Sequence, residues 1–265
     1  MHRGKAEFAA TRYGVFYEQL TKIFVMEKKV TAFGDSILKG VVLNSDALPF
    51  SKVPYVVTEN KFSDECSRRL GVAVENYGKF GSTIVQGEAV IDRRLSTIAP
   101  GEYVILEYGG NDCDYNWSEI GKSPSDVHSP RTALAVFVER YSAVIDKIKA
   151  IGARPVLLSL PPLEPQRYFN YFSRLFCNVL KNNVMEWMKG VVYFIDRWHE
   201  SYNLEVFKLA ILKRVPVIDI TSAFLGRRDY GDFMCADGIH PNERGHALIA
   251  DSIVEHCNRK GVVFS

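Results

Sequence analysis

Short apolar segments alternate with longer amphipathic segments along most of this chain, and this alternation strongly limits the folds open to it. The apolar segments are rich in Val, Ile, Leu and Tyr and are mostly bounded by Gly or Pro, which is typical of buried strands. The expected strands cover residues 29–33, 72–77, 103–108, 154–160 and 215–220. The intervening segments repeat apolar residues at helical spacing. The expected helices cover residues 63–70, 84–98, 132–151, 168–188, 191–213 and 242–257.

This order of elements predicts the class of fold. Near-continuous apolar runs suit parallel strands that are buried on both faces. Strands that alternate with helices predict a doubly wound, five-stranded parallel sheet between two helical layers, a three-layer α/β/α sandwich of the flavodoxin-like type. Such sheets bind ligands outside the carboxyl ends of their strands, so the residues that follow each strand are the candidates for a functional site.

Polar blocks follow three of the expected strands, and a fourth block precedes the last helix. The first block, Gly34-Asp35-Ser36, would be read alone as a capped helix start, because Asp and Ser are common caps. Its interpretation therefore depends on the other three blocks. These are the segment around Gly81, the segment Gly109-Gly110-Asn111-Asp112, and the segment from Asp237 to His240.

Together and in this order, the four blocks resemble those of the SGNH hydrolases, also called the GDSL esterase/lipase family. The resemblance runs from about residue 28 to residue 257. Two departures are small: Ile37 stands where the family often has leucine, which is a packing change, and Gly110 occupies a variable place. The resemblance implies the SGNH hydrolase fold and a serine esterase or acylhydrolase that works through an acyl-serine intermediate.

The resemblance also implies a role for each block. Ser36 would be the nucleophile and His240 its base, because an imidazole with an ordinary pKa near 6.5 suits proton transfer near neutrality. Asp237 would accept a hydrogen bond from the imidazole and complete the catalytic triad. The oxyanion hole would consist of the backbone N–H groups of Ser36 and Gly81 and the side-chain amide of Asn111.

Other polar residues in these blocks are expected to have structural roles. Asp35 and Asp112 can hold their loops through bonds to backbone N–H groups, and Asp219 can cap a helix. Gly78 and Thr83 fit loop geometry and helix capping. No motif supports a functional role for four further histidines, which are His128, His199, His246 and His256.

Two aromatic segments, residues 113–130 and 161–172, follow strands and should border the site. Tyr115, Trp117 and Tyr168 are the candidate substrate contacts, although the same aromatics could instead pack these loops onto the domain. We favour an ester with a small or short acyl chain, such as an acetylated carbohydrate. Lysophospholipase or thioesterase activity within the same family is the alternative.

Two different classes of protein remain as rivals, a non-catalytic α/β binding module and a flavodoxin-like redox protein. An intact set of Ser36, Asn111, Asp237 and His240 argues against the first, and no phosphate-binding loop supports the second. No close group of His, Asp and Glu resembles a metal site. We therefore expect a small-molecule ester as substrate, with no cofactor and no metal.

The net charge and the cysteine content limit the possible partners and the cellular compartment. A net charge of +2 does not call for nucleic acid or an acidic membrane surface, and no stretch has the apolar length of a membrane span. Five cysteines, an odd number without a pairing pattern, suggest reduced thiols in a cytoplasm. Cys66, Cys177 and Cys257 are expected to be small core residues.

The beginning of the chain differs from the remainder. We expect residues 28–265 to form a single hydrolase domain and residues 1–27 to form an N-terminal helical extension. The apolar stripe of this helix would dock on the domain or on a second subunit, which would make a homo-oligomer; it consists of Tyr13, Phe16, Leu20, Ile23 and Phe24. Alternatively, translation starts at Met26 and the preceding residues are an upstream extension of the reading frame.

Overall fold

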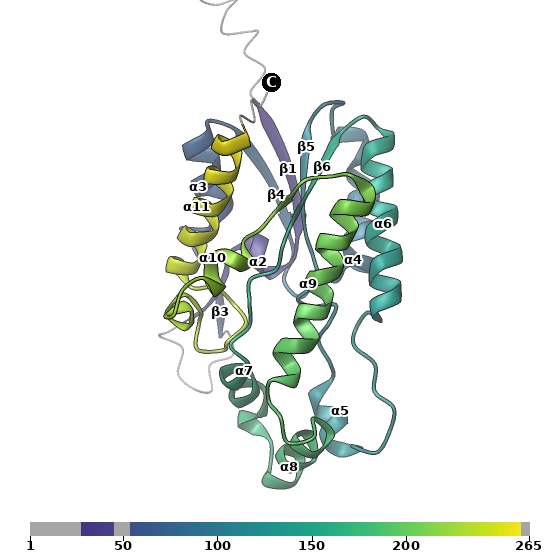
Figure 1. The fold of residues 1–265 in the computed structure, drawn as a ribbon, viewed down its shortest axis with the longest axis vertical. Coiled ribbons are helices and arrows are strands. Elements are labelled where there is room, and N and C mark those ends of the chain that lie inside the picture. The colour runs from purple at the N-terminus through teal and green to yellow at the C-terminus, as the bar shows by residue number, and fades with distance from the viewer. Residues whose placement is uncertain (1–27, 45–53, 261–265) are drawn as a thin grey trace, which may run out of the picture.

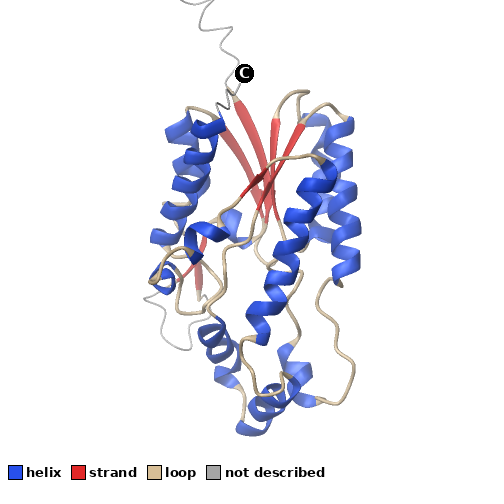
Figure 2. Cartoon of the chain, in the orientation of Figure 1, coloured by secondary structure: helices blue, strands red, loops and turns tan. Residues whose placement is uncertain are grey.

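A computed structural model describes residues 28–44 and 54–260, and these residues form a layered α/β fold (Figures 1 and 2). The central sheet has five strands in the order β4-β1-β5-β6-β7, and every neighbouring pair is parallel. The strands are β1 (Lys29–Gly34), β4 (Ala73–Gly78), β5 (Tyr103–Glu107), β6 (Arg154–Leu158) and β7 (Val217–Ile218). The predicted fold class is therefore confirmed.

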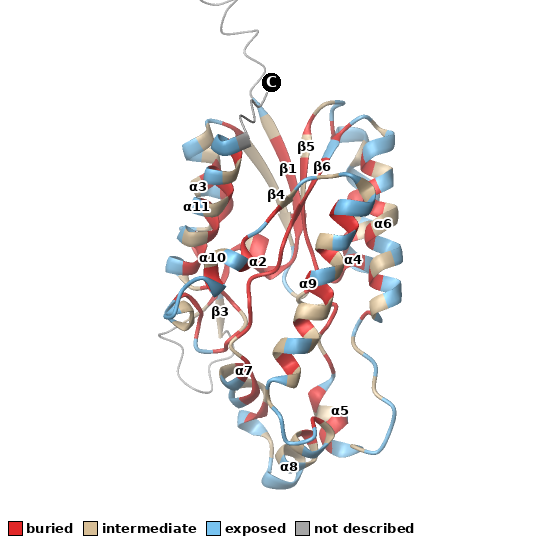
Figure 3. Cartoon of the chain, in the orientation of Figure 1, coloured by how far each residue is buried: buried red, intermediate tan, exposed pale blue. Residues whose placement is uncertain are grey.

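Helices cover both faces of the sheet, and their inward sides are buried (Figure 3). One face packs against α4 (Ile84–Arg94), α6 (Leu134–Ala150) and α9 (Phe194–Lys213). The opposite face packs against α2 (Ser36–Lys39), α3 (Phe62–Leu70), α10 (Thr221–Leu225) and α11 (Glu243–Lys260). Alternate strand residues point to opposite faces, so Ala32 belongs to one core and Phe33 to the other.

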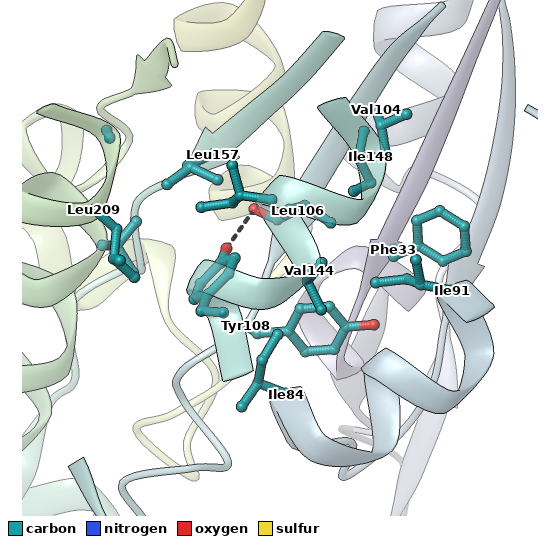
Figure 4. Packing of buried hydrophobic residues seen from close by; sticks show 14 of the residues in the cluster. Phe33, Ile84, Ile91, Val104, Leu106, Tyr108, Val144, Ile148, Leu157 and Leu209 are labelled. Atoms are coloured by element: carbon teal, nitrogen blue, oxygen red, sulfur yellow. Dashed lines mark hydrogen bonds between the residues drawn. The ribbon is translucent and has the colours of Figure 1, made fainter. Parts of the chain in front are cut away.

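Buried hydrophobic side chains of the sheet pack against those of α4, α6 and α9 (Figure 4). Phe33, Leu106 and Leu157 come from neighbouring strands and are fully buried there. The hydroxyl of Tyr141, on α6, donates a hydrogen bond to the carbonyl of Leu106 at 3.0 Å. This bond satisfies a buried polar group and ties α6 to the strand that leads into the third polar block.

A third cluster, which we call the helical cap, lies beyond the carboxyl ends of the strands, at the bottom of Figure 1. Its helices are α5 (Trp117–Lys122), α7 (Pro165–Phe172) and α8 (Asn178–Trp187), and it packs on the start of α9. Aromatic rings fill it, with Trp117 stacked on Phe172 at 4.7 Å between centroids. The cap therefore covers the end of the sheet where a ligand site is expected.

The prediction of one helix over residues 168–188 is wrong, because α7 and α8 are separate. After Phe172 the chain forms a 3₁₀ turn over Ser173–Leu175, and Phe176 and Cys177 are extended. The break directs Phe172 and Phe176 toward each other, with 6.1 Å between their ring centroids. The predicted break near Gly190 is confirmed, since Gly190 has a φ of 73° and α9 begins soon after it.

Three smaller expectations also fail. The helix expected to begin at Ser63 begins instead at Phe62, with Lys61 at the cap position; Ser63 is buried and accepts a hydrogen bond from the Asn76 amide at 2.9 Å. The strand expected over 215–220 is only two residues long, because the chain turns into α10. Cys177 is exposed rather than a core residue, whereas Cys66 and Cys257 are buried.

The sequence analysis missed a small hairpin-like pair of antiparallel strands, β2 (Val41–Leu43) and β3 (Tyr55–Val57). Each strand has three residues, too few to show a clear alternation. Short 3₁₀ helices at Leu95–Thr97 and Tyr230–Phe233 complete the described elements. None of the described helices is long and apolar enough to cross a membrane. The expected N-terminal helix lies outside the described residues.

Candidate active site

Ser36 lies at the point where the sheet reverses its winding. β1 has β4 on one side and β5 on the other, so the loops that leave β1 and β5 diverge and open a crevice at their carboxyl ends. Asp35 caps the short helix α2, and its side chain accepts a hydrogen bond from the Ile37 N–H at 2.8 Å. Ser36 is the first residue of this helix, where backbone N–H groups have no helical partner.

The turn before Ser36 requires a residue without a side chain. A Cβ at Gly34 would lie 2.8 Å from the backbone oxygen of Glu107, from its Oε2 atom and from Leu38. The absence of a side chain therefore lets β5 approach the serine turn closely. At the other end of α2, Gly40 has a φ of 82° and terminates the helix after a single turn.

The C-terminal block brings His240 to Ser36, although 204 positions separate them in the sequence. His240 Nε2 lies 3.0 Å from Ser36 Oγ, and His240 Nδ1 lies 2.7 Å from Asp237 Oδ2. An ionised carboxylate can only accept, so Nδ1 carries the proton and Nε2 is left to accept from the serine hydroxyl. The three residues predicted as a triad are thus connected in the order that general-base chemistry needs.

Asp237 is fully buried and multiply hydrogen-bonded. Its Oδ1 atom accepts from the backbone N–H groups of Ile239 at 3.1 Å and His240 at 3.2 Å. Burial by itself would raise the pKa of Asp237, but the hydrogen bond and charge of His240 and the backbone bonds lower the pKa below its ordinary value. The carboxylate therefore stays ionised opposite the imidazole.

Two aromatic side chains that the sequence analysis missed flank the His240 ring. The Tyr55 ring, on β3, has its centroid 5.0 Å from that of His240, and the Phe80 ring stacks on it at 6.1 Å with 16° between planes. Burial raises the pKa of Tyr55 above its ordinary value, so the phenol remains neutral. Phe80 precedes Gly81 in the second block, and this position is the only feature of the sequence that could have indicated that Phe80 lies at the site.

Gly81 and Asn111, the two predicted oxyanion donors outside the serine turn, line the same cavity as Ser36. Gly81 has a φ of +70°, a conformation that favours glycine, and a Cβ there would have Asn111 Oδ1 as its nearest neighbour at 4.0 Å. The Asn111 amide donates to Asp35 Oδ2 at 2.8 Å. An amide nitrogen carries two hydrogens, so a second remains for a substrate oxygen.

Arg131 connects these two donors, and sequence reasoning did not single it out. Its Nη1 donates to Asn111 Oδ1 at 3.2 Å, and its Nη2 donates to the Gly81 carbonyl at 2.9 Å. One guanidinium thus fixes the orientation of the Asn111 amide and its position relative to Gly81. Arg131 directly follows the aromatic 113–130 segment and belongs to none of the four polar blocks.

A second carboxyl group lies beneath the serine turn and was also missed. Glu107, the last residue of β5, is fully buried, and its Oε2 atom accepts from the Asp35 N–H at 3.2 Å. Its Oε1 atom has no hydrogen-bond partner among the described residues. Burial and then the charge of Asp35 raise the pKa of Glu107 well above its ordinary value. Glu107 is therefore neutral, and it holds the backbone of Asp35 in place beneath the serine turn.

The expected structural roles of the neighbouring polar residues are confirmed. Both oxygens of Asp112 accept from the Ile84 N–H, at 3.0 and 3.1 Å, and burial raises the pKa of Asp112 to about 7. Thr83 forms a capping box with Gln86 at the start of α4. Asp219 accepts from the backbone N–H of Ser222 at 2.9 Å and so caps the first turn of α10.

A cavity of about 130 Å³ extends from Ser36 and His240 into the helical cap. Trp117 and Tyr168 line it, and both donate to Asp114 Oδ1, at 2.9 and 2.8 Å. Tyr115 is not among the lining residues; it packs against Trp187 in the aromatic cluster of the cap. In the described part of the chain, no group of three or more His, Cys, Asp or Glu side chains could hold a metal ion.

Comparisons with solved structures agree with this fold. A lipase/acylhydrolase from Enterococcus faecalis aligns with a TM-score of 0.58 and 19% identity, covering 89% of this chain and 97% of its own. A member of the lipolytic protein G-D-S-L family from Veillonella parvula aligns at 0.57 and 17%, with 87% and 98% covered. Est24, a carbohydrate acetylesterase from Sinorhizobium meliloti, aligns at 0.58 and 16%, with 88% and 99% covered.

Sequence identities below 25% show a shared fold and nothing more. A search of curated proteins found no significant match. The family assignment comes from the sequence itself. The family model for GDSL-like lipase/acylhydrolase matches residues 32–248, a span that contains all four polar blocks and most of the described sheet. This chain belongs to the GDSL-like lipase/acylhydrolase family and is a hydrolase that acts on esters.

Proposed function

We propose that this protein hydrolyses a carboxylic ester through an acyl-serine intermediate, with Ser36 as nucleophile, His240 as base and Asp237 as the orienting carboxylate. The observation that carries the proposal is the position of the His240 ring between the two partners. Nε2 lies 3.0 Å from Ser36 Oγ and Nδ1 lies 2.7 Å from Asp237. Hydrogen-bond contact of this kind is what a serine needs to act as a nucleophile near neutrality.

In the first step Ser36 Oγ attacks the ester carbonyl while its proton moves to His240 Nε2. The imidazolium that forms is stabilised by Asp237, and the carbonyl oxygen becomes an oxyanion. The N–H groups of Ser36 and Gly81 and the Asn111 amide are the proposed donors to this oxygen. His240 then protonates the departing alcohol. Water repeats the sequence on the acyl-serine, releasing the acid and regenerating the hydroxyl.

The proposed substrate carries a small or short acyl group. The cavity beside Ser36 has about 130 Å³, below the roughly 300–1,000 Å³ typical of sites that enclose larger ligands. An acetylated carbohydrate fits this proposal, and the likeness to Est24, which is described as a carbohydrate acetylesterase, supports it at the level of the fold. Lysophospholipase and thioesterase activities are the alternative outcomes.

A panel of p-nitrophenyl esters of increasing acyl length, run beside acetylated sugars and a long-chain thioester, tests the substrate. We expect the highest kcat/KM with the shortest acyl groups. A maximum at long acyl chains or with the thioester would contradict the proposed substrate and favour an alternative. Ser36→Ala should abolish turnover, while Ser96→Ala, a change at an exposed serine on the 3₁₀ turn after α4, serves as the matched control.

A further inference from the structure

A histidine that no motif singled out lines the catalytic cavity. His199 lies on α9, and its side chain borders the same cavity as Ser36 and Asn111. The residue is 2% exposed, so it belongs to the buried side of the helix together with Ile195 and Tyr202. Buried helix positions of this kind are usually occupied by apolar residues. A histidine buried there costs free energy unless its ring nitrogens form hydrogen bonds.

No described residue supplies that partner. His199 Nδ1 is buried without a hydrogen bond. The nearest carboxylate oxygen paired with it, Glu200 Oε1, lies 3.7 Å away, beyond hydrogen-bond distance. Glu200 Oε1 is itself buried without a hydrogen bond, and only its Oε2 atom is paired, with the Asn203 amide at 3.1 Å. The other ring nitrogen of His199, Nε2, makes no hydrogen bond with a described residue, and it is the atom that a ligand in the cavity can use.

The cavity contains a second polar group that suits a neutral ligand. Asp114 lines it and is fixed by the Tyr168 hydroxyl and the Trp117 indole, which both donate to Oδ1. Among the described residues that line the cavity there are three carboxyl groups, on Asp35, Glu107 and Asp114, and no Lys or Arg. An anionic group would have no cationic partner there, whereas a hydroxyl can donate to one group and accept from another.

We propose that His199 and Asp114 form a subsite that hydrogen-bonds a hydroxyl group of the substrate. This inference rests on the proposed function, because it concerns the ester that Ser36 attacks. It narrows the substrate class to esters whose acyl or alcohol part carries a hydroxyl, such as partly acetylated polyols and sugars. A plain alkyl group at this place would leave Nε2 of His199 without a hydrogen-bond partner, which disfavours it.

Two matched pairs of esters test the subsite. On the acyl side, p-nitrophenyl 3-hydroxybutyrate is compared with p-nitrophenyl butyrate; on the alcohol side, a monoacetylated sugar is compared with cyclohexyl acetate. We expect kcat/KM to favour the hydroxylated member of at least one pair by roughly 10–100-fold, the range that one buried unpaired group implies. The pair that responds identifies the side of the ester that carries the hydroxyl.

Variants at His199 then link the preference to the residue. His199→Phe should reduce the preference at least tenfold, and His199→Gln, which retains hydrogen-bonding groups, should keep more of it. His128→Phe is the matched control, because His128 is bonded to the Ser123 carbonyl and does not line the cavity. The readout is the ratio of kcat/KM values, which a general loss of stability would not change.

The outcomes separate this inference from the proposed function. Wild type without a preference in either pair, or with a preference that both His199 variants retain in full, would overturn the subsite. Hydrolysis of the plain esters by Ser36→Ala would overturn the proposed function instead. Turnover that requires Ser36, together with a preference that falls in His199→Phe, would support both.

Discussion

At the scale of single residues, the proposed oxyanion donors are held in place before a substrate arrives. Asn111 is oriented from both ends, by Asp35 on its nitrogen and by Arg131 on its oxygen. Such preorganised donors act mainly on the transition state. Asn111→Ala should therefore lower kcat by roughly 10²–10³ with little change in KM. Steady-state kinetics on a short-chain ester measure this, and a change in KM alone would assign Asn111 to substrate binding.

Glu107 gives a prediction for stability against pH. Its folded-state pKa is raised by burial, so its contribution to stability is fully present below the unfolded value of about 4.3 and falls as pH rises toward the folded value. Glu107→Gln cannot ionise and keeps an oxygen for the Asp35 N–H. The variant should gain Tm relative to wild type at pH 8, and this difference should disappear near pH 4.

Thermal melts across this range check the prediction. Glu59→Gln, at an exposed position, is the control and should show no comparable pH-dependent difference. A Tm difference between Glu107→Gln and wild type that stays constant from pH 4 to pH 8 would mean that Glu107 is not held neutral by burial.

At the scale of elements, the site joins loops that follow different strands. Arg131 connects the loop after β4, through the Gly81 carbonyl, with the loop after β5, through Asn111. Arg131→Gln should lower kcat about tenfold, because a hydrogen bond to a charged group contributes about 1.5–3 kcal/mol. The kcat of Arg131→Lys should lie between those of wild type and Arg131→Gln, since an ammonium group keeps the charge but cannot bond both partners with the planar geometry of a guanidinium.

The comparison for Arg131 is Arg140→Gln, which removes an exposed arginine of α6 that pairs with Glu88 of α4. This control should leave kcat unchanged. A loss of stability in Arg131→Gln without a loss of kcat would restrict Arg131 to a structural role.

Elements with a strong local signal could be predicted from the sequence, and the others depend on distant contacts. The buried strands and the stripe of α6 have such signals, and they lie within a few residues of the expected bounds. The division between α7 and α8 has no Gly or Pro to mark it; it is associated with the packing of Phe172 and Phe176 in the cap. Likewise, nothing near Tyr55 in the sequence indicates that β3 reaches His240.

The same distinction applies to the site. The grouping of Ser36, Gly81, Asn111, Asp237 and His240 could be predicted because each stands in a recognisable block. Glu107 reads as an ordinary strand residue, and only its burial against Asp35 gives it a role. Arg131 and His199 lie outside every block, so their relation to the site follows from the fold alone.

At the scale of the whole molecule, the family match and the four blocks all lie downstream of residue 31. We propose residues 28–265 as the hydrolase domain and residues 1–27 as a separable extension. Deleting residues 1–25, so that the chain begins at Met26, should leave ester hydrolysis intact and could change only stability or oligomeric state. Activity assays, thermal melts and light scattering test this. A truncated protein that folds normally but is inactive would show that the extension reaches the active site.

The central claim is that Ser36 is the nucleophile, and covalent labelling tests it most directly. The protein is treated with a fluorophosphonate, and the modified peptide is mapped by mass spectrometry. The account predicts one adduct, on Ser36, formed much more slowly in His240→Ala and absent in Ser36→Ala, with both variants melting close to wild type. An adduct on another residue, or undiminished labelling of Ser36→Ala, would contradict it.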